Sequence, residues 1–322
     1  MKKKKINNSK LFSKKQLKLY GFDSYFSKFI KLFAKRKLPN TLLISGQKGI
    51  GKSVFINHFV NYLLSANEIN KYDLINFTIN IDSQAYKLFK NNIHPNVFNI
   101  YNEKFDKNIG VNEIRNLINF LNKSSNLNNL KFVIIDNFES LNKNSSNALL
   151  KVLEEPKKNT FFFLIFDNES KILSTIKSRC SEFKIFFSKE EKNKIFEKLI
   201  NEYKIELFDQ KILDLLNYES PGNLLNYIIS TGDLYFEFSN LKVDFIINCI
   251  KKYELEKDSN LLKTIIFLIQ NFYHENCFKN INNINNYLYD YKNINNKLYY
   301  LKKYNLNEKT ILKTISDNLK NE

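Results

Sequence analysis

The strongest chemical signal in the sequence is a glycine-rich loop at residues 46–53, Gly-Gln-Lys-Gly-Ile-Gly-Lys-Ser. It fits the phosphate-binding pattern G-x-x-x-x-G-K-[ST]. Glycines let the backbone curl so that successive N–H groups point at phosphate oxygens, and the helix that begins there adds its positive end. Lys52 would reach the β- and γ-phosphates, and Ser53 would hold Mg²⁺. The pattern therefore predicts that a nucleotide is bound by Gly46, Gly49, Ile50, Gly51, Lys52 and Ser53.

A nucleotide with bound Mg²⁺ also needs an acid, and Asp136 is the candidate. It directly follows a short apolar run at residues 132–135. In P-loop proteins an aspartate at such a place, after a buried strand, positions the metal. The alternative is an aspartate that starts a turn. Asn137, the next residue, cannot take up a proton as a general base.

Arginine is rare in this chain, with three copies at positions 36, 115 and 179 among 50 lysines and arginines. A guanidinium offers a planar fork of donors that lysine cannot copy, so each remaining arginine is a candidate for a task that needs this fork. Arg179 lies in the segment Ser178-Arg179-Cys180. Two interpretations are open for it: a binding or catalytic role, or an ordinary pair with a carboxylate.

Two glutamates, Glu154 and Glu155, end a predicted helix just before Pro156, in the segment N-A-L-L-K-V-L-E-E-P at residues 147–156. The helix dipole disfavours anions at this end. A local rule broken in this way indicates a functional or tertiary constraint. A solvated helix end is the alternative explanation.

Alternating strands and helices must position these residues. We expect strands at 41–45, 97–101, 132–135 and 161–166, and helices at 15–37 (with a possible break at Gly21), 52–66, 111–123, 145–155 and, as a short helix or turn, 172–177. This alternation predicts a parallel α/β sheet through about residue 187. A polar, Asn-rich stretch at 67–92 carries no predicted element. Short helices at 190–203, 209–216 and 222–230 and a helical tail follow the sheet.

The composition narrows the class of protein. The chain has 322 residues, a formal charge of +17 and 43% hydrophobic residues, which suits two or three domains with real cores. Lysine is abundant throughout, so the basic charge alone does not identify a nucleic-acid partner. The three cysteines form no C-x-x-C pair, which argues against a zinc site or disulfides and favours a reduced, cytoplasmic setting. No signal peptide or membrane span is expected.

Taken together, the motifs resemble the clamp-loader branch of the AAA+ ATPases. They are the phosphate loop, the strand before Asp136, the segment N-A-L-L-K-V-L-E-E-P, a further strand and Ser178-Arg179-Cys180. Within that branch the chain resembles the delta-prime type of bacterial DNA polymerase III, which the segment Gly110 to Arg115 and the preceding His94-Pro95 also fit. The resemblance covers roughly residues 17–229 by motif, and the helical tail by position only.

The resemblance implies roles for single residues. Arg179 matches the arginine that acts in trans and reaches the γ-phosphate bound by a neighbouring subunit, where an arginine finger stabilises charge on the transferring phosphoryl group. Lys151 and Lys171 match positions that face bound DNA, with ordinary surface lysines as the alternative. Cys180 would then be a packed core thiol. Arg115 matches a family arginine, without an assigned role.

The chain departs from that family at positions that matter for hydrolysis. Asn137 stands where hydrolytic AAA+ ATPases usually carry a glutamate that activates water. Asn223 follows Pro221-Gly222, where a nucleotide-sensing arginine is usual, and Asp167 stands where a neutral Asn or Thr is usual. The four-cysteine zinc module of many relatives is missing, so no zinc is expected. We therefore expect a site that can bind ATP with Mg²⁺ but hydrolyses it weakly or not at all, which leaves the enzyme assignment open.

The predicted fold class is α/β. We expect an AAA+ P-loop domain with a parallel sheet at residues 1–187, a small helical lid at 188–234 and an all-α collar at 235–322 that joins subunits. The predicted function is that of a delta-prime-type clamp-loader subunit. Its partners would be gamma/tau- and delta-type subunits, the sliding clamp and primed DNA, with no membrane. Alternatives are a self-sufficient AAA+ ATPase motor of the gamma/tau type, a small-molecule P-loop kinase, and a structural or DNA-binding protein with a relict P-loop.

Overall fold

The computed structural model describes residues 16–101, 108–123, 130–168, 170–206, 211–232, 234, 243–279, 284–304 and 308–320. The chain divides into two compact units. Among the described residues, one unit joins the chain up to Lys198 to Ser220–Asn223, and the other joins Leu199–Glu219 to the chain from Leu224 onward. The N-terminal segment, for which no signal peptide is expected, lies outside the described residues. The predicted boundaries at residues 187 and 234 stay a prediction.

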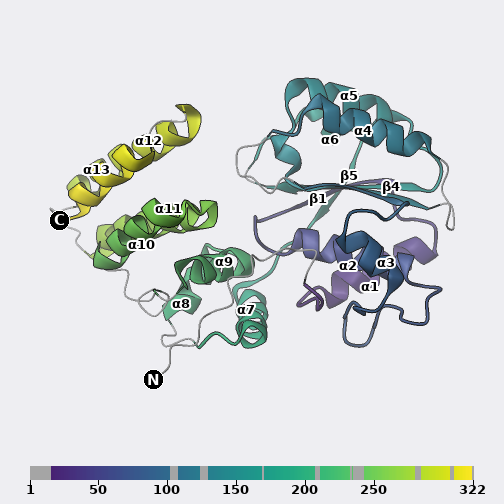
Figure 1. The fold of residues 1–322 in the computed structure, drawn as a ribbon, viewed down its shortest axis with the longest axis horizontal. Helices are drawn as coiled ribbons and strands as arrows, with labels where there is room; N and C mark the ends of the chain where they lie inside the picture. Colours follow the sequence, from purple (N-terminus) through teal and green to yellow (C-terminus); the bar gives the residue numbers. More distant parts are fainter. Residues whose placement is uncertain are drawn as a thin grey trace. The chain divides into compact units, whose positions relative to one another are not determined.

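The first unit is built on a parallel sheet of five strands in the order β2-β3-β4-β1-β5 (Figure 1). The strands are β1 (Thr41–Gly46), β2 (Val97–Ile100), β3 (Lys131–Ile135), β4 (Thr160–Asp167) and β5 (Ser181–Lys184). The strand β1 pairs with β4, where Leu43 lies opposite Leu164, and with β5, where Ile44 lies opposite Phe183. Since all strands run the same way, their carboxyl ends meet at one edge of the sheet.

Helices cover both faces of this sheet. Figure 1 shows α1 (Asp23–Ala34), α2 (Lys52–Leu64) and α3 (Gln84–Lys90) on one side, and α4 (Val111–Asn122), α5 (Lys143–Glu154) and α6 (Ser174–Lys177) on the other. The strands β1 and β3 are buried along their whole length, which is why they appear in the sequence as continuous apolar runs. The predicted α/β fold with a parallel sheet, followed by helices, is confirmed.

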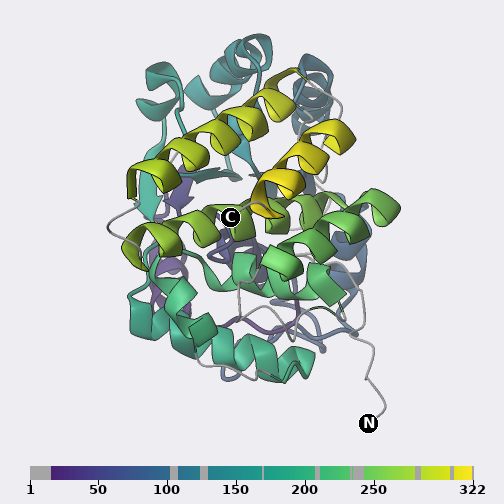
Figure 2. The ribbon, with the colours of Figure 1, turned by 90° about the vertical axis from the view of Figure 1, so that its left-hand side faces the viewer.

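The second unit is helical in the part that the structure describes. The helix α7 (Lys189–Tyr203) leads into it, followed by α8 (Lys211–Asp214), the 3-10 turn η2 (Leu215–Asn217), α9 (Pro221–Thr231), α10 (Val243–Glu256), α11 (Ser259–Lys279), α12 (Ile284–Tyr304) and α13 (Glu308–Lys320). The helix α10 packs on α11 and α13, and α12 packs on the same two helices (Figure 2). On α13 the buried residues Leu312, Ile315 and Leu319 lie at helical spacing.

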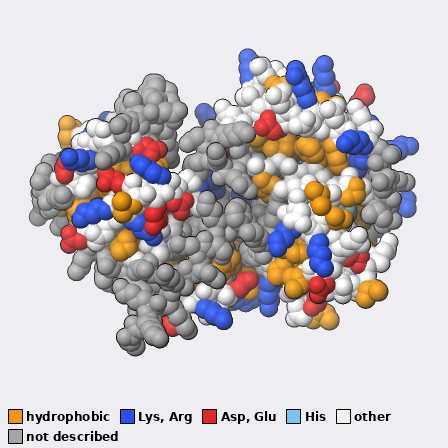
Figure 3. Space-filling model, in the orientation of Figure 1, with side chains coloured by type: hydrophobic (Ala, Val, Ile, Leu, Met, Phe, Trp, Pro, Cys, Tyr) orange, Lys and Arg blue, Asp and Glu red, His pale blue; other side chains and the backbone are white. Residues whose placement is uncertain are grey.

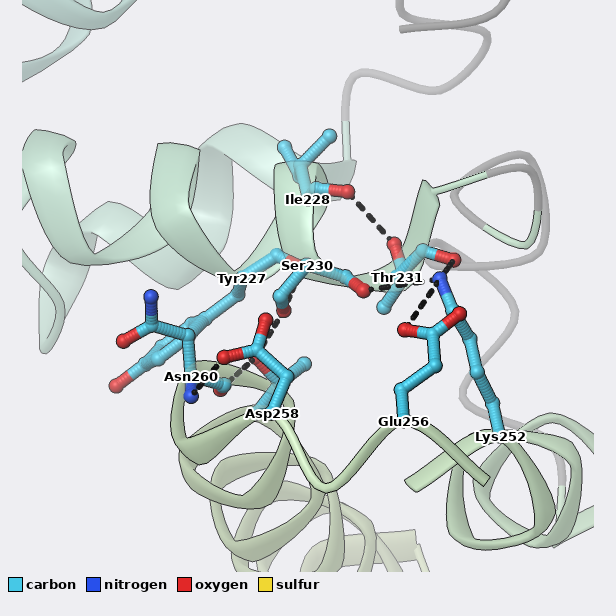
Figure 4. Close-up of polar contacts among 9 residues, drawn as sticks. Tyr227, Ile228, Ser230, Thr231, Lys252, Glu256, Asp258 and Asn260 are labelled. Atoms are coloured by element: carbon cyan, nitrogen blue, oxygen red, sulfur yellow. Dashed lines mark hydrogen bonds and ion pairs between the residues drawn. The ribbon is translucent and has the colours of Figure 1, made fainter. Parts of the chain in front are cut away.

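Polar groups fix the junction of α9, α10 and α11 (Figure 4). Lys252 Nζ donates to the carbonyl oxygens of Ser230 at 3.2 Å and Thr231 at 2.9 Å, the last two residues of α9. A cation therefore caps the negative end of this helix. Glu256 lies 3.9 Å from the same Nζ, and the hydroxyls of Ser230 and Thr264, 2.7 Å apart, join α9 to α11.

The first predicted helix begins later than residue 15, which itself lies outside the described residues. The helix α1 starts at Asp23, because the backbone before it pairs with a distant segment. The Leu19 N–H donates to the Phe77 carbonyl at 3.0 Å, and the Ile79 N–H donates to the Leu17 carbonyl at 2.8 Å. The helical spacing of apolar residues in this segment was therefore misleading.

One α-helix and one strand of the first unit were absent from the prediction. The helix α3 lies inside the Asn-rich stretch, and its first N–H groups are satisfied from far away: Glu68 accepts from the N–H of Gln84 at 3.0 Å and of Ala85 at 2.8 Å. An anion at this end is favourable, but sequence periodicity does not show it. The edge strand β5 has four residues and no apolar run, so it gives no strand signal. Among the described residues, no helix is both long and apolar enough to span a membrane.

Candidate functional site

The glycine-rich loop connects β1 to α2 at the carboxyl edge of the sheet. Gly46, Gly49 and Gly51 all have positive φ, at +156°, +76° and +102°. Gly51 is the N-cap of α2, and the Phe55 N–H donates to its carbonyl at 2.9 Å to start the helix. The loop therefore has the curled backbone and the helix N-terminus that a phosphate-binding loop requires.

Lys52 is the cation of this loop and is only 6% exposed. Its Nζ donates to the carbonyl oxygens of Gly46 at 2.6 Å and Gln47 at 2.8 Å. Burial disfavours the charged amine and lowers the pKa of Lys52 from 10.5 to about 8, against the opposing effects of Asp167, Asp136 and Glu139. The amine is thus held inside the loop, close to three carboxylates.

Asp136 and Ser53 are brought together as the sequence predicts for a magnesium site. The Ser53 side chain hydrogen bonds to the carboxylate of Asp136, and the Asn137 N–H donates to Asp136 Oδ1 at 2.9 Å. Burial raises the pKa of Asp136, while these hydrogen bonds and Lys52 oppose the shift. A hydroxyl and a carboxylate are the oxygen donors that Mg²⁺ prefers, so these residues fit a nucleotide with its metal.

Tyr101 is a member of this site that the sequence interpretation missed. It directly follows β2, and its hydroxyl donates to Asn57 Oδ1 at 2.7 Å and also hydrogen bonds to Ser53. Burial raises the pKa of Tyr101, so the phenol stays protonated. The only available signal was its position at the end of a strand beside β3.

Glu139 also lies at this edge, although the sequence gave it no role. The 3-10 turn η1 (Phe138–Ser140) begins after Asn137, which adopts the left-handed conformation with φ +51°. Asn tolerates this conformation better than most residues. The turn places Glu139 Oε2 3.4 Å from the Asp167 N–H. Within the described part of the chain, no three acidic, His or Cys side chains form a group suited to hold a metal without other ligands.

The start of α9 packs directly on the glycine-rich loop. The Gly222 N–H donates to the Gly49 carbonyl at 3.2 Å. A Cβ atom at Gly49 would lie 2.3 Å from Asn223 Oδ1, and a Cβ atom at Gly222 would lie 2.4 Å from the Gly49 oxygen. Gly222 requires glycine because the close atom is a backbone oxygen, and Gly49 requires it because its φ is +76°. Asn223, where the sequence resemblance leads us to expect an arginine, brings its amide to the loop.

Arg179 follows α6 and pairs with the end of α5. Its Nε and Nη2 both donate to Glu154 Oε1, at 3.0 Å and 2.6 Å, while Nη1 donates to the Thr175 carbonyl at 2.8 Å and more weakly to the Ser178 hydroxyl at 3.4 Å. Among the described residues, none of these bonds goes to the glycine-rich loop. The Arg179 side chain remains 34% exposed. The two separate motifs of the sequence therefore form one structural unit.

The two lysines assigned to DNA are exposed in this unit. Lys151 lies on α5 and Lys171 lies in the connection between β4 and α6. On the face shown in Figure 3, Lys and Arg side chains are scattered over the first unit, with acidic side chains between them. Arg115 is exposed on α4. The structure therefore leaves both lysines accessible.

Comparisons with known sequences give a consistent result. A family model described as "DNA polymerase III, delta subunit" matches residues 22–188. The DNA polymerase III subunit delta' of Buchnera aphidicola subsp. Schizaphis graminum (strain Sg) is 32% identical over 240 residues, 74% of this chain and 68% of that protein. The delta' subunits of Pseudomonas aeruginosa and Escherichia coli (strain K12) are 34% and 28% identical over 47% and 48% of this chain, and 44% and 45% of their own.

Among solved structures, a DNA polymerase III gamma subunit-related protein of Thermotoga maritima is similar over 92% of this chain and 98% of its own. The TM-score is 0.45 and the sequence identity 18%. The residues matched by the family model contain both the glycine-rich loop and Arg179.

Proposed function

The chain belongs to the family of DNA polymerase III delta-prime subunits, and we propose that it acts as a clamp-loader subunit that lends Arg179 to the ATPase site of a neighbouring subunit. Its partners would be gamma/tau- and delta-type subunits. Together they would place the sliding clamp on primed DNA.

The observation that carries this proposal is the setting of Arg179. Its guanidinium is ordered by Glu154 and Thr175, is partly exposed, and has no hydrogen bond to the glycine-rich loop of its own chain within the described residues. A guanidinium that is not used by its own nucleotide site is available to another one. There it would stabilise the charge that develops on the transferring phosphoryl group, an effect worth ~10³–10⁵ in rate in the best cases.

The glycine-rich loop is proposed to bind ATP with Mg²⁺. Gly46, Gly49, Ile50 and Gly51 would surround the phosphates with backbone N–H groups. Lys52 would neutralise the β- and γ-phosphates, and Ser53 with Asp136 would hold the metal, which supplies charge neutralisation when bound. Asn137 offers no base, so the chain itself would hydrolyse ATP weakly or not at all.

The remaining parts of the proposal concern the rest of the chain. Lys151 and Lys171 would contact DNA phosphates. Residues 188–234 would serve as a helical lid and residues 235–322 as a collar that joins the subunits. The proposed setting is cytoplasmic, without a membrane partner, and the chain needs no zinc for these tasks.

The test is the ATPase activity of a reconstituted clamp loader, stimulated by clamp and primed DNA, with this chain as wild type and as Arg179→Ala. We expect turnover to fall by about tenfold or more with the assembly intact, in line with arginine-finger chemistry. Unchanged turnover would mean that Arg179 only stabilises the fold, and the clamp-loader role in trans would be abandoned.

One observation favours the alternative of a self-sufficient ATPase. Glu139 brings a carboxylate to the edge where Asp136 and Asp167 end their strands, and it raises the pKa of Lys52 through space. Such a carboxylate could replace the missing base at position 137. Measurable ATP hydrolysis by the isolated chain that disappears in Glu139→Gln would support this alternative.

A further inference from the structure

Glu154 contacts only one edge of the Arg179 guanidinium, the edge formed by Nε and Nη2. Glu154 Oε1 accepts from both Nε and Nη2 of Arg179. Nη1 is occupied by the Thr175 carbonyl and the Ser178 hydroxyl. A guanidinium has five N–H donors. One N–H of Nη2 therefore has no hydrogen-bond acceptor among the described residues, and it belongs to the partly exposed end of the side chain.

The position of Glu154 needs an explanation, because it is the last residue of α5. A carboxylate there is repelled by the negative end of the helix dipole. The adjacent Glu155 has no ion pair with any described residue and is also exposed to solvent. The Arg179 guanidinium compensates the repulsion at Glu154 alone. The pair also joins α5 to α6 across 25 residues of sequence.

The exposure of the pair indicates whether it stabilises the fold or orders the Arg179 side chain. The Glu154 side chain is 48% exposed and the Arg179 side chain 34% exposed. Solvent therefore screens their attraction, and the pair contributes little to the stability of the fold. A phosphate group with its greater charge could add to the free Nη2 N–H, or compete for the guanidinium, without a large barrier. What the pair does provide is order, since a free arginine side chain loses considerable rotamer freedom when it is fixed.

We infer that Glu154 is a positioning residue for Arg179: it holds the guanidinium by Nε and Nη2 and presents the remaining Nη2 N–H to a phosphoryl group of the neighbouring subunit. This inference rests on the proposed function, because it needs Arg179 to act in trans. It assigns a task to the glutamate pair that the sequence showed as an anomaly. Only the first glutamate has this task.

The experiment uses the reconstituted clamp loader with Mg-ATP, clamp and primed DNA, and changes only this chain. The variants are Glu154→Ala, Glu154→Gln, Arg179→Ala, the double variant of Glu154→Ala with Arg179→Ala, and Glu155→Gln as the matched control. Size-exclusion chromatography monitors assembly, and kcat and KM for ATP are measured separately. A merely structural residue would change assembly or both constants, whereas a positioning residue changes kcat.

We expect Glu154→Ala to lower kcat by about tenfold with KM unchanged, the scale of ordering one long side chain. Glu154→Gln keeps an oxygen acceptor but loses its charge, so its kcat should fall by only about threefold. The double variant should be no slower than Arg179→Ala, and Glu155→Gln should match the wild type. If the alanine variant does not assemble, the threefold loss of kcat in Glu154→Gln carries the test.

Contrary outcomes are distinct. If Arg179→Ala slows turnover while both Glu154 variants are silent, the inference falls and the proposed function stands. A faster Glu154→Ala complex would mean that Glu154 withholds the guanidinium, and a double variant slower than Arg179→Ala would mean that Glu154 acts separately; both overturn the inference. If Arg179→Ala is silent as well, the proposed function and the inference fall together.

Discussion

The glycine-rich loop and the corner around Arg179 place their cations in opposite surroundings. Lys52 is 6% exposed, donates to carbonyl groups of its own loop and lies close to three carboxylates. Arg179 is 34% exposed and leaves one donor unused toward solvent, as far as the described residues show. The first cation is arranged to receive a small ligand inside the chain. Under the proposed function the second would be offered to another molecule, so changes in the two regions should affect different measurable quantities.

The largest effect is expected for Arg179→Lys in the assembled complex. Lysine keeps the charge but cannot form the fork that Glu154 and Thr175 hold, so the ammonium will not be fixed in place. We expect ATP turnover by the complex to fall by roughly 10², nearly as far as for Arg179→Ala. ATP binding by this chain alone, measured by calorimetry, should not change. Near-normal turnover would show that any cation suffices at position 179, and the proposed difference in role between Arg179 and Lys52 would be wrong.

A smaller effect, on a different quantity, is expected for Lys52→Ala. Removing the loop cation takes away a charge-assisted contact to the phosphates, so the affinity of the isolated chain for Mg-ATP should fall by about 10–100-fold. Calorimetric titration with Mg-ATP measures it, and Lys48→Ala, a lysine in the same loop, tests whether charge alone is responsible. If turnover of the complex falls as far as in the Arg179 variants, the two regions act as one site.

The pH dependence of nucleotide binding sharpens the contrast further. Because folding lowers the pKa of Lys52 from 10.5 to about 8, the buried amine loses its proton as the pH rises through about 8. Folding stability contributed by this group then increases between pH 8 and 10.5, since the unfolded chain still binds the proton. Affinity for ATP should decrease over the same range, by at most about tenfold per pH unit.

Lys52→Arg is the control for this pH dependence, since a guanidinium stays charged throughout. Its affinity for Mg-ATP, titrated at pH 7, 8 and 9, should be flat. An equal decline in Lys52→Arg and in the wild type would assign the pH dependence to another group.

The smallest effects are expected for the exposed lysines. Lys151→Ala and Lys171→Ala should each reduce the slope of log K against log salt by about one for binding of primed DNA to the complex. Affinity at one salt concentration should fall only severalfold, because each lysine contacts a phosphate as a point charge. Fluorescence anisotropy over a salt series measures both quantities. Lys28→Ala on the opposite face of the sheet is the control, and an equal change there would indicate general charge rather than contact.

Much of the fold could be predicted because its signals are local. The strands β1, β3 and β4 are buried on both faces and therefore appear as apolar runs. The glycine-rich loop follows from its spacing alone. The late start of α1 could not be predicted, because its cause is pairing with residues 77–79. These residues lie about sixty positions further along the chain, so the pairing closes a long loop that local sequence patterns do not reveal.

The parts of the candidate site that escaped prediction depend on packing between distant segments. Glu154 and Arg179 each gave a local signal, but only the contact of α5 with α6 makes them partners. Tyr101 and Glu139 join the site because neighbouring strands end at one edge, while their own residue types are unremarkable for a strand end or a turn. Asn223 reaches Gly49 only through the approach of α9.

The hydrogen bond from the Gly222 N–H to the Gly49 carbonyl provides a probe of local opening at the glycine-rich loop. While this bond is formed, the Gly222 amide hydrogen is shielded and exchanges slowly with deuterium. When the bond opens, the hydrogen becomes free to exchange. The exchange rate of the Gly222 amide therefore reports how readily this contact opens in the intact chain.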